Sequence, residues 1–161
     1  MKESAGILPF QIDGARLRVL LAHPGGPFWA ARDLGAWSIA KGEMAAGETP
    51  EAAARREFHE ETGWSIDSEL LPLGTVRQKA GKTVHCFAAD ARFDPLTLRS
   101  NEFDLEWPPR SGRTASFPEI DRVEWFDMDN ACLKILEAQR PFLARLMSAV
   151  ETSPRPGDRP A

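Results

Sequence analysis

The segment KGEMAAGETPEAAARREFHEETGW, residues 41–64, determines the expected fold, because it joins a loop to a short helix rich in carboxylates. Thr49 is a good N-cap and Pro50 suits the first helical position. Gly63 is a natural stop, since glycine adopts without strain the positive φ at which helices commonly end. These signals predict a helix from about Pro50 to Gly63.

Three glutamates share one edge of that helix. At about 100° per residue, Glu57 and Glu61 lie one turn apart and Glu60 lies beside them, while Phe58 occupies the adjoining stripe that would pack on a sheet. Like charges at this spacing repel, and more strongly when partly buried. Two interpretations stay open: a solvated acidic face with ion pairs such as Arg56 with Glu60, or a site for Mg²⁺, which binds carboxylates together with substrate phosphates.

Composition limits the class of protein. The 161 residues, 42% hydrophobic and 27% charged, suffice for one domain, expected over residues 1–150, followed by a disordered tail over 151–161 that contains three prolines. The net charge of −4 provides no basic field for polymeric nucleic acid. No segment approaches the roughly 20 apolar residues that cross a bilayer, so we expect a cytoplasmic protein without a membrane partner. We expect it to be either a monomer or a homodimer.

Cysteines and histidines form no metal pattern. Cys86 and Cys132 are far apart in the sequence, make neither a zinc motif nor a disulfide framework, and are expected to be buried thiols. His23, His59 and His85 make no metal-ligand set, and His59 is expected on the solvated face of the helix.

The rest of the chain suggests a sheet with a late helix. SAGILPF and RLRVLLAH flank the turn signal at Asp13 and Gly14, WSIA is expected to be a brief strand, residues 73–79 and 83–91 form a second hairpin, and RVEWF closes the sheet. Residues 94–118 lack a sustained period and are expected to be a long binding loop. Residues 127–150 have helical spacing and predict one helix broken or kinked at Pro141.

The carboxylate-rich segment matches a known motif at every specified position. The Nudix box G-x5-E-x7-R-E-U-x-E-E-x-G-U, with U a bulky apolar residue, corresponds to Gly42, Glu48, Arg56, Glu57, Phe58, Glu60, Glu61, Gly63 and Trp64. A chance match has a probability on the order of 10⁻⁶ in a chain of this size. The sequence resembles the Nudix hydrolases, MutT-like members in particular, and HPGGPFW, GAWSIAKGE, SNEFDLEWPP and FPEIDRVEWF resemble a subgroup of predicted NTP pyrophosphohydrolases. The resemblance implies an α/β fold, an α/β/α sandwich around a mixed β-sheet.

The resemblance also implies a metal site. Glu57 and Glu61 would be primary ligands of Mg²⁺, or of Mn²⁺ in its place, Glu60 a further ligand or water-orienting group, and the Gly42 carbonyl another oxygen donor. A salt bridge between Glu48 and Arg56 would fix the loop to the helix. The family hydrolyses a nucleoside diphosphate linked to a group X by in-line attack of water on phosphorus.

The general base is either on the box helix, as Glu60, or in a later loop. Glu119, six residues before Trp125, resembles the loop glutamate of MutT-type relatives; it can equally be a surface acid, and Glu102, Glu106 and Glu124 are weaker alternatives. Lys41 can meet a phosphate oxygen or be an ordinary loop lysine. The candidates for stacking on a base, each of which can instead serve packing, are Phe28, Trp29, Phe103 and Trp107.

Two functions remain open. An intact box favours an active Mg²⁺-dependent pyrophosphohydrolase over a non-catalytic nucleotide-binding regulatory module, which would be free to lose Glu57 or Glu61. The substrates considered are nucleoside triphosphates, dinucleoside polyphosphates such as diadenosine tetraphosphate, and diphosphoinositol polyphosphates. The last are disfavoured because Arg77, Lys79 and Lys82 supply only a sparse cationic surface.

Overall fold

Eight strands and three helices make up the computed structural model, which describes residues 2–152. The elements are β1 (Glu3–Asp13), β2 (Arg16–Pro24), β3 (Ala40–Glu43), α1 (Pro50–Thr62), β4 (Leu71–Arg77), β5 (Thr83–Asp90), β6 (Glu102–Glu106), β7 (Thr114–Pro118), β8 (Ile120–Asp127), α2 (Met128–Lys134) and α3 (Arg140–Thr152), with short 3₁₀ turns at Lys79–Gly81, Pro95–Thr97 and Glu137–Gln139.

The main sheet is mixed. Five strands follow the order β4-β5-β1-β2-β8, and β3 adds to β1 beside β2. β1 and β5 are parallel, whereas the other pairs in this sheet are antiparallel. The long β1 therefore pairs with β3 through its first half and with β2 through its second half, which places the start of the box beside the centre of the sheet.

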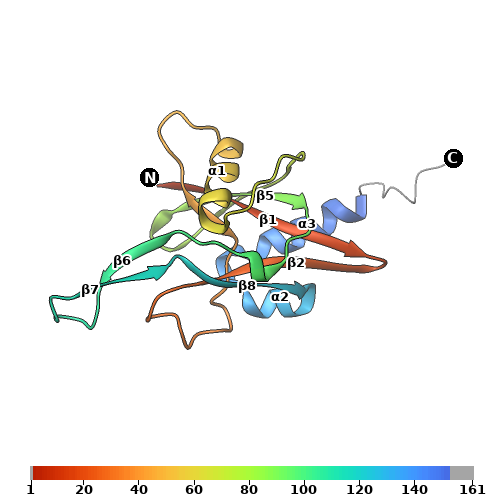
Figure 1. Ribbon diagram of the computed structural model, residues 1–161. Helices are drawn as coiled ribbons and strands as arrows, with labels where there is room; N and C mark the ends of the chain where they lie inside the picture. Colours follow the sequence, from red (N-terminus) through yellow and green to blue (C-terminus); the bar gives the residue numbers. More distant parts are fainter. Residues whose placement is uncertain (1, 153–161) are drawn as a thin grey trace.

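Helices cover both faces of this sheet, with α1 on one side and α2 and α3 on the other (Figure 1). Ala53, Ala54 and Phe58 of α1 join one buried apolar cluster, while Ala131, Phe142 and Leu146 of the later helices join the second. Because each helix buries one apolar face against the sheet, the result is the expected α/β/α sandwich.

Several local predictions agree with the structure. Asp13 pairs with Arg16 at the predicted turn between β1 and β2, and β4 and β5 form the second hairpin. The WSIA strand is shorter than expected: Trp37 and Ser38 make only isolated bridges, and regular pairing starts at Ala40.

The prediction of a long loop over residues 94–118 is wrong. It contains β6 and β7, which pair from Glu102 with Pro118 to Glu106 with Thr114 and extend as an arm from the body (Figure 1). The alternation of EFDLE does have a strand period, but five residues are too few to establish it without the partner strand.

The late helix breaks at a different place from the one predicted. α2 ends at Lys134, and Pro141 lies in the first turn of α3, where a proline is tolerated. The break is tertiary in origin, because Ile135 bridges Trp37 and the Leu136 N–H donates to the Trp37 carbonyl at 2.8 Å.

Two further expectations concern the cysteines and the tail. Cys86 is buried as predicted, but Cys132 is exposed, since Ala131 takes the inward position on α2. The predicted tail begins inside α3, which continues to Thr152, and residues 153–161 lie outside the described chain.

Candidate active site

The capped helix α1 carries the predicted carboxylates. The Thr49 hydroxyl oxygen accepts from the Ala52 N–H at 3.2 Å, and Gly63 ends the helix with φ of 80°. Glu57 is buried at 8% exposure, whereas His59 faces solvent as expected. The acidic edge therefore borders the buried face of α1.

Arg56 ties the loop before α1 to the helix. Its Nε and Nη2 donate to the two carboxylate oxygens of Glu48 at 2.8 and 2.9 Å, and Nη2 also donates to the Glu43 carbonyl at 3.1 Å. Nη1 lies 2.9 Å from Glu57 and 3.2 Å from Glu60. The guanidinium, followed by the Ala45 N–H, lowers the pKa of Glu48 to about 2. Glu48 and Arg56 thus form a bidentate ion pair that closes the loop on the helix.

Gly42 leaves room for the Glu57 carboxylate. A Cβ atom at this position would lie 1.9 Å from Glu57 Oε2, so no larger residue fits without displacing that side chain. Burial raises the pKa of Glu57 above its ordinary value even though Arg56 lowers it. Gly42 of β3 and Glu57 of α1 therefore lie in close contact.

A small cleft brings Glu61 and Glu119 together. It has a volume of about 140 Å³ and is lined by Ala22, Pro24, Ser38, Ile39, Ala40, Lys41, Glu61, Glu119 and Ile120. Burial, and then the charges of Glu119 and Glu57, raise the pKa of Glu61 to about 7, while a hydrogen bond from Asn101 opposes this. Glu119, the single residue between β7 and β8, thus brings a carboxylate to the same place as the box helix. Glu102, Glu106 and Glu124 do not line this cleft.

Lys41 also lines the cleft. Burial lowers its pKa, as does the nearby charge of Lys82, whereas the charges of Glu61, Glu43 and Glu57 raise it. The ammonium group therefore lies beside the carboxylates and not in open solvent. In this position it can contact an anionic ligand.

A divalent cation fits these residues in donor chemistry and charge. In the described range 2–152, no group of three His, Cys, Asp or Glu side chains is already arranged to hold a metal ion, and Glu57 and Glu60 both contact Arg56. Burial is the first cause of the raised pKa values of Glu57 and Glu61, and the charges of neighbouring carboxylates add to it; a hard cation with oxygen ligands would stabilise both groups in their charged form. The oxygen donors suit Mg²⁺ or Mn²⁺.

None of the aromatic candidates is among the residues that line the cleft. Phe28, 62% exposed, contacts Trp107 edge to face with ring centroids 5.5 Å apart. Phe103 packs against Gly26, and a Cβ atom added at Gly26 would lie 2.9 Å from the Phe103 ring. Within the same loop, the Arg32 guanidinium lies 5.5 Å from the centroid of the Trp29 ring. Residues 25–32, the aromatic loop, therefore rest against the arm formed by β6 and β7.

Sequence reasoning missed Asn101 and Ser38. Asn101 hydrogen-bonds Glu61, and its carbonyl accepts from the Glu119 N–H at 2.8 Å. Ser38 lines the cleft and donates to the Ile39 carbonyl at 2.8 Å. Neither residue type has a distinctive spacing, so only the pairing of distant segments reveals them.

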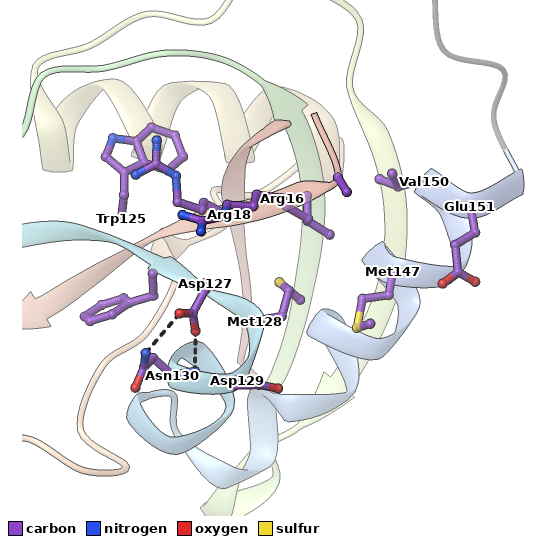
Figure 2. A pocket seen from close by; sticks show the side chains of 13 residues that line it. Arg16, Arg18, Trp125, Asp127, Met128, Asp129, Asn130, Met147, Val150 and Glu151 are labelled. Carbon is purple, nitrogen blue, oxygen red and sulfur yellow. Dashed lines mark hydrogen bonds between the residues drawn. The ribbon is translucent and has the colours of Figure 1, made fainter. Parts of the chain in front are cut away.

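A larger hollow of about 730 Å³ lies elsewhere, between β2, the end of β8 and the helices α2 and α3 (Figure 2). Its lining includes Arg16, Arg18, Asp127, Met147 and Glu151, and Asp127 accepts hydrogen bonds from Asn130. None of the predicted site residues lines it. Size alone therefore does not identify the site.

Residues 2–146 match the family model described as the NUDIX domain. The chain belongs to the Nudix family. This agrees with the box and with the α/β/α sandwich. Among residues 2–152, no helix combines the length and the apolar character needed to cross a membrane.

The chain is also similar to two curated proteins and to a solved structure. An octanoyltransferase of Myxococcus xanthus is 32% identical over 97 residues, which are 60% of this chain and 24% of that protein. An oxidized purine nucleoside triphosphate hydrolase of Danio rerio is 33% identical over 99 residues, 58% of this chain and 62% of the relative. The chain thus spans less than two thirds of either protein.

The solved structure is the Ap4A hydrolase of C. elegans. It superposes with a TM-score of 0.62 at 19% identity, covering 94% of this chain and 99% of that one. At this identity the likeness establishes the Nudix fold alone.

Proposed function

We propose that this Nudix protein is a divalent-metal-dependent pyrophosphohydrolase that cleaves a nucleoside diphosphate linked to a group X. The observation that carries the proposal is the meeting of Glu61 on α1 with Glu119, between β7 and β8, in one cleft with Lys41. The residues that would hold Mg²⁺ or Mn²⁺ are Glu57, Glu60, Glu61 and the carbonyl of Gly42. When bound, the cation supplies neutralisation of pyrophosphate oxygens and a lower pKa for bound water.

The side chains of the chain itself divide the remaining work. Glu119 takes the proton of the attacking water, for which a carboxylate within hydrogen-bond reach is suited. Lys41 meets a phosphate oxygen, while Arg56 and Glu48 keep the box loop on the helix and do not touch the substrate. Phe28 and Trp29 offer exposed aromatic surface on the loop that follows Pro24, a residue of the cleft lining, and aromatic faces accept any nucleobase.

The substrate ranked first is a nucleoside triphosphate or a dinucleoside polyphosphate. The names of two relatives, an oxidized purine nucleoside triphosphate hydrolase and an Ap4A hydrolase, support this ranking without deciding between the two. Lys41 is the single cationic residue in the lining of the cleft, which argues against a densely phosphorylated inositol.

A substrate panel tests the proposal. Ordinary and oxidised purine triphosphates, diadenosine tetraphosphate and diphosphoinositol polyphosphates are each incubated with Mg²⁺, with Mn²⁺ and with a chelator, and the products are identified by mass spectrometry. We expect metal-dependent release of a nucleoside phosphate, and incorporation of ¹⁸O from labelled water identifies the attacked phosphorus. Tight nucleotide binding without any turnover would instead support the non-catalytic module.

A further inference from the structure

His23 is a fully buried side chain at the end of β2, and both of its ring nitrogens have partners. Nδ1 lies 2.8 Å from Asp121 Oδ1, and Nε2 lies 2.6 Å from the carbonyl oxygen of Arg32. The edge of the ring packs against Trp37, with centroids 5.1 Å apart. These contacts join three segments that are distant in the sequence.

Both partners are hydrogen-bond acceptors. A carbonyl oxygen accepts only, and so does an ionised carboxylate, whereas a neutral imidazole has one donor and one acceptor nitrogen. Only the doubly protonated imidazolium of His23 donates to Arg32 and to an ionised Asp121 together. Other charged groups nearby are Arg122, whose guanidinium lies 5.1 Å from the Trp37 ring, and Asp33, which accepts from the Trp37 indole N–H.

The position of His23 connects it to both halves of the site. Its neighbours Ala22 and Pro24 line the cleft, and Asp121 lies two residues after Glu119. The aromatic loop leaves β2 at Pro24 and returns at Arg32, whose carbonyl the imidazole holds. A second link, from the Gly25 N–H to the Glu119 carbonyl at 2.9 Å, ties the start of the same loop to the same segment.

We propose that His23, as a buried imidazolium paired with Asp121, is a positioning residue that locks the aromatic loop to the start of β8 and thereby fixes Glu119 over the cleft. It touches no substrate itself. The consequence for activity rests on the proposed function of Glu119 and of the aromatic loop, but the protonation state and the anchoring of the loop do not.

The protonation state is tested first, by NMR of ¹⁵N-histidine-labelled protein slightly above neutral pH, where a free histidine is mostly neutral. We expect His23 to carry protons on both ring nitrogens. In Asp121→Asn the side-chain amide can donate to Nδ1, so the ring should become neutral and keep its proton on Nε2. A neutral His23 ring in the wild-type protein, or a doubly protonated ring in Asp121→Asn, would overturn the assignment.

The anchoring is tested by hydrogen exchange and kinetics in three variants. Asp121→Ala and His23→Gln should speed amide exchange in residues 25–32 and 119–121 while β4 and β5 stay protected. With a substrate from the panel, both variants should lower kcat at least about tenfold, because displacing Glu119 by up to about 1 Å from the reacting atoms would slow the reaction. Asp121→Asn, which keeps both hydrogen bonds, should stay within about threefold of wild type.

Asp90→Asn, which alters an exposed carboxylate at the end of β5, is the matched control and should change nothing. Unchanged exchange in residues 25–32 in both Asp121→Ala and His23→Gln would refute the positioning role. If no panel member is hydrolysed, the proposed function fails while the NMR and exchange results still decide the role of His23. Global unfolding of His23→Gln leaves the decision with Asp121→Ala.

Discussion

Glu61 on α1 and Glu119, the residue between β7 and β8, line the same cleft. Burial raises the pKa of Glu61 to about 7, and the charge of Glu119 is the next largest cause. Two carboxylates in this arrangement repel each other unless a cation or a proton intervenes. Substitutions at Glu61 and Glu119 therefore test the proposed metal site directly.

Glu61→Gln and Glu57→Gln, which preserve shape but remove charge, should each lower kcat at least about a hundredfold with the fold intact, because they remove proposed cation ligands. Steady-state kinetics with Mg²⁺ and circular dichroism measure the two effects. Glu51→Gln on the first turn of the same helix is the control. Near-normal activity in both ligand variants would rule out this site.

Glu119→Gln should lower kcat far more than it raises KM, because a base matters for proton removal rather than for binding. The acidic limb of the pH profile should change as well, and excess Mg²⁺ should recover part of the loss if Glu119 is chiefly a metal ligand. A wild-type kcat and pH profile in Glu119→Gln, together with loss of both in Glu60→Gln, would place the base on α1 instead.

Arg56→Ala should lower both the melting temperature and the activity, since it frees Glu48 and two helical glutamates. The pH dependence has a defined sign: because the pKa of Glu48 is lowered from 4.5 to about 2, its stabilisation is present above pH 4.5 and is lost as the pH falls toward 2. Thermal melts across this range should show a shallower decline in Glu48→Gln than in wild type. Parallel declines of the melting temperature in the two proteins would show that the ion pair does not contribute to stability at acid pH.

Gly42→Ala should weaken metal binding, because the new methyl group would displace the Glu57 carboxylate. A ligand that binds only the folded state raises the melting temperature, so the rise produced by saturating Mg²⁺ in wild type should shrink in the variant. The same Mg²⁺ titration curve in both proteins would show that Glu57 does not bind the cation from this position.

Phe28→Ala should raise KM about fivefold or more, given roughly 1–3 kcal/mol per stacked base. Leu34→Ala removes another exposed apolar side chain, 70% exposed, from the connection between β2 and β3 and is the matched control. Equal effects of the two variants on KM would indicate that apolar packing, and not stacking on a base, is what Phe28 contributes.

Local signals predicted the parts of the molecule whose causes are local. Thr49, Pro50 and Gly63 define α1 through capping and backbone conformation alone, and the short apolar runs on either side of the Asp13–Gly14 turn mark β1 and β2. The Nudix box identified Glu57, Glu60 and Glu61 as the candidate site carboxylates on α1, although their roles remain predictions.

Tertiary contacts determined what the sequence did not show. The end of α2 depends on Trp37, which pairs with the chain at Ile135 across a long sequence separation. The bond from Asn101 to Glu61 and the buried contacts of His23 likewise join segments that only the folded sheet brings together. No periodicity in a single segment encodes such partners.

The arm formed by β6 and β7 has a consequence for how such a protein can diversify. Within the described chain these strands pair with each other and not with the main sheet, and β7 ends beside Glu119. Residues 107–113 at its tip can be lengthened, shortened or exchanged without altering a register in the six-stranded sheet. Selection can therefore change the length and composition of this tip while the main sheet and the helix that carries the box stay unchanged.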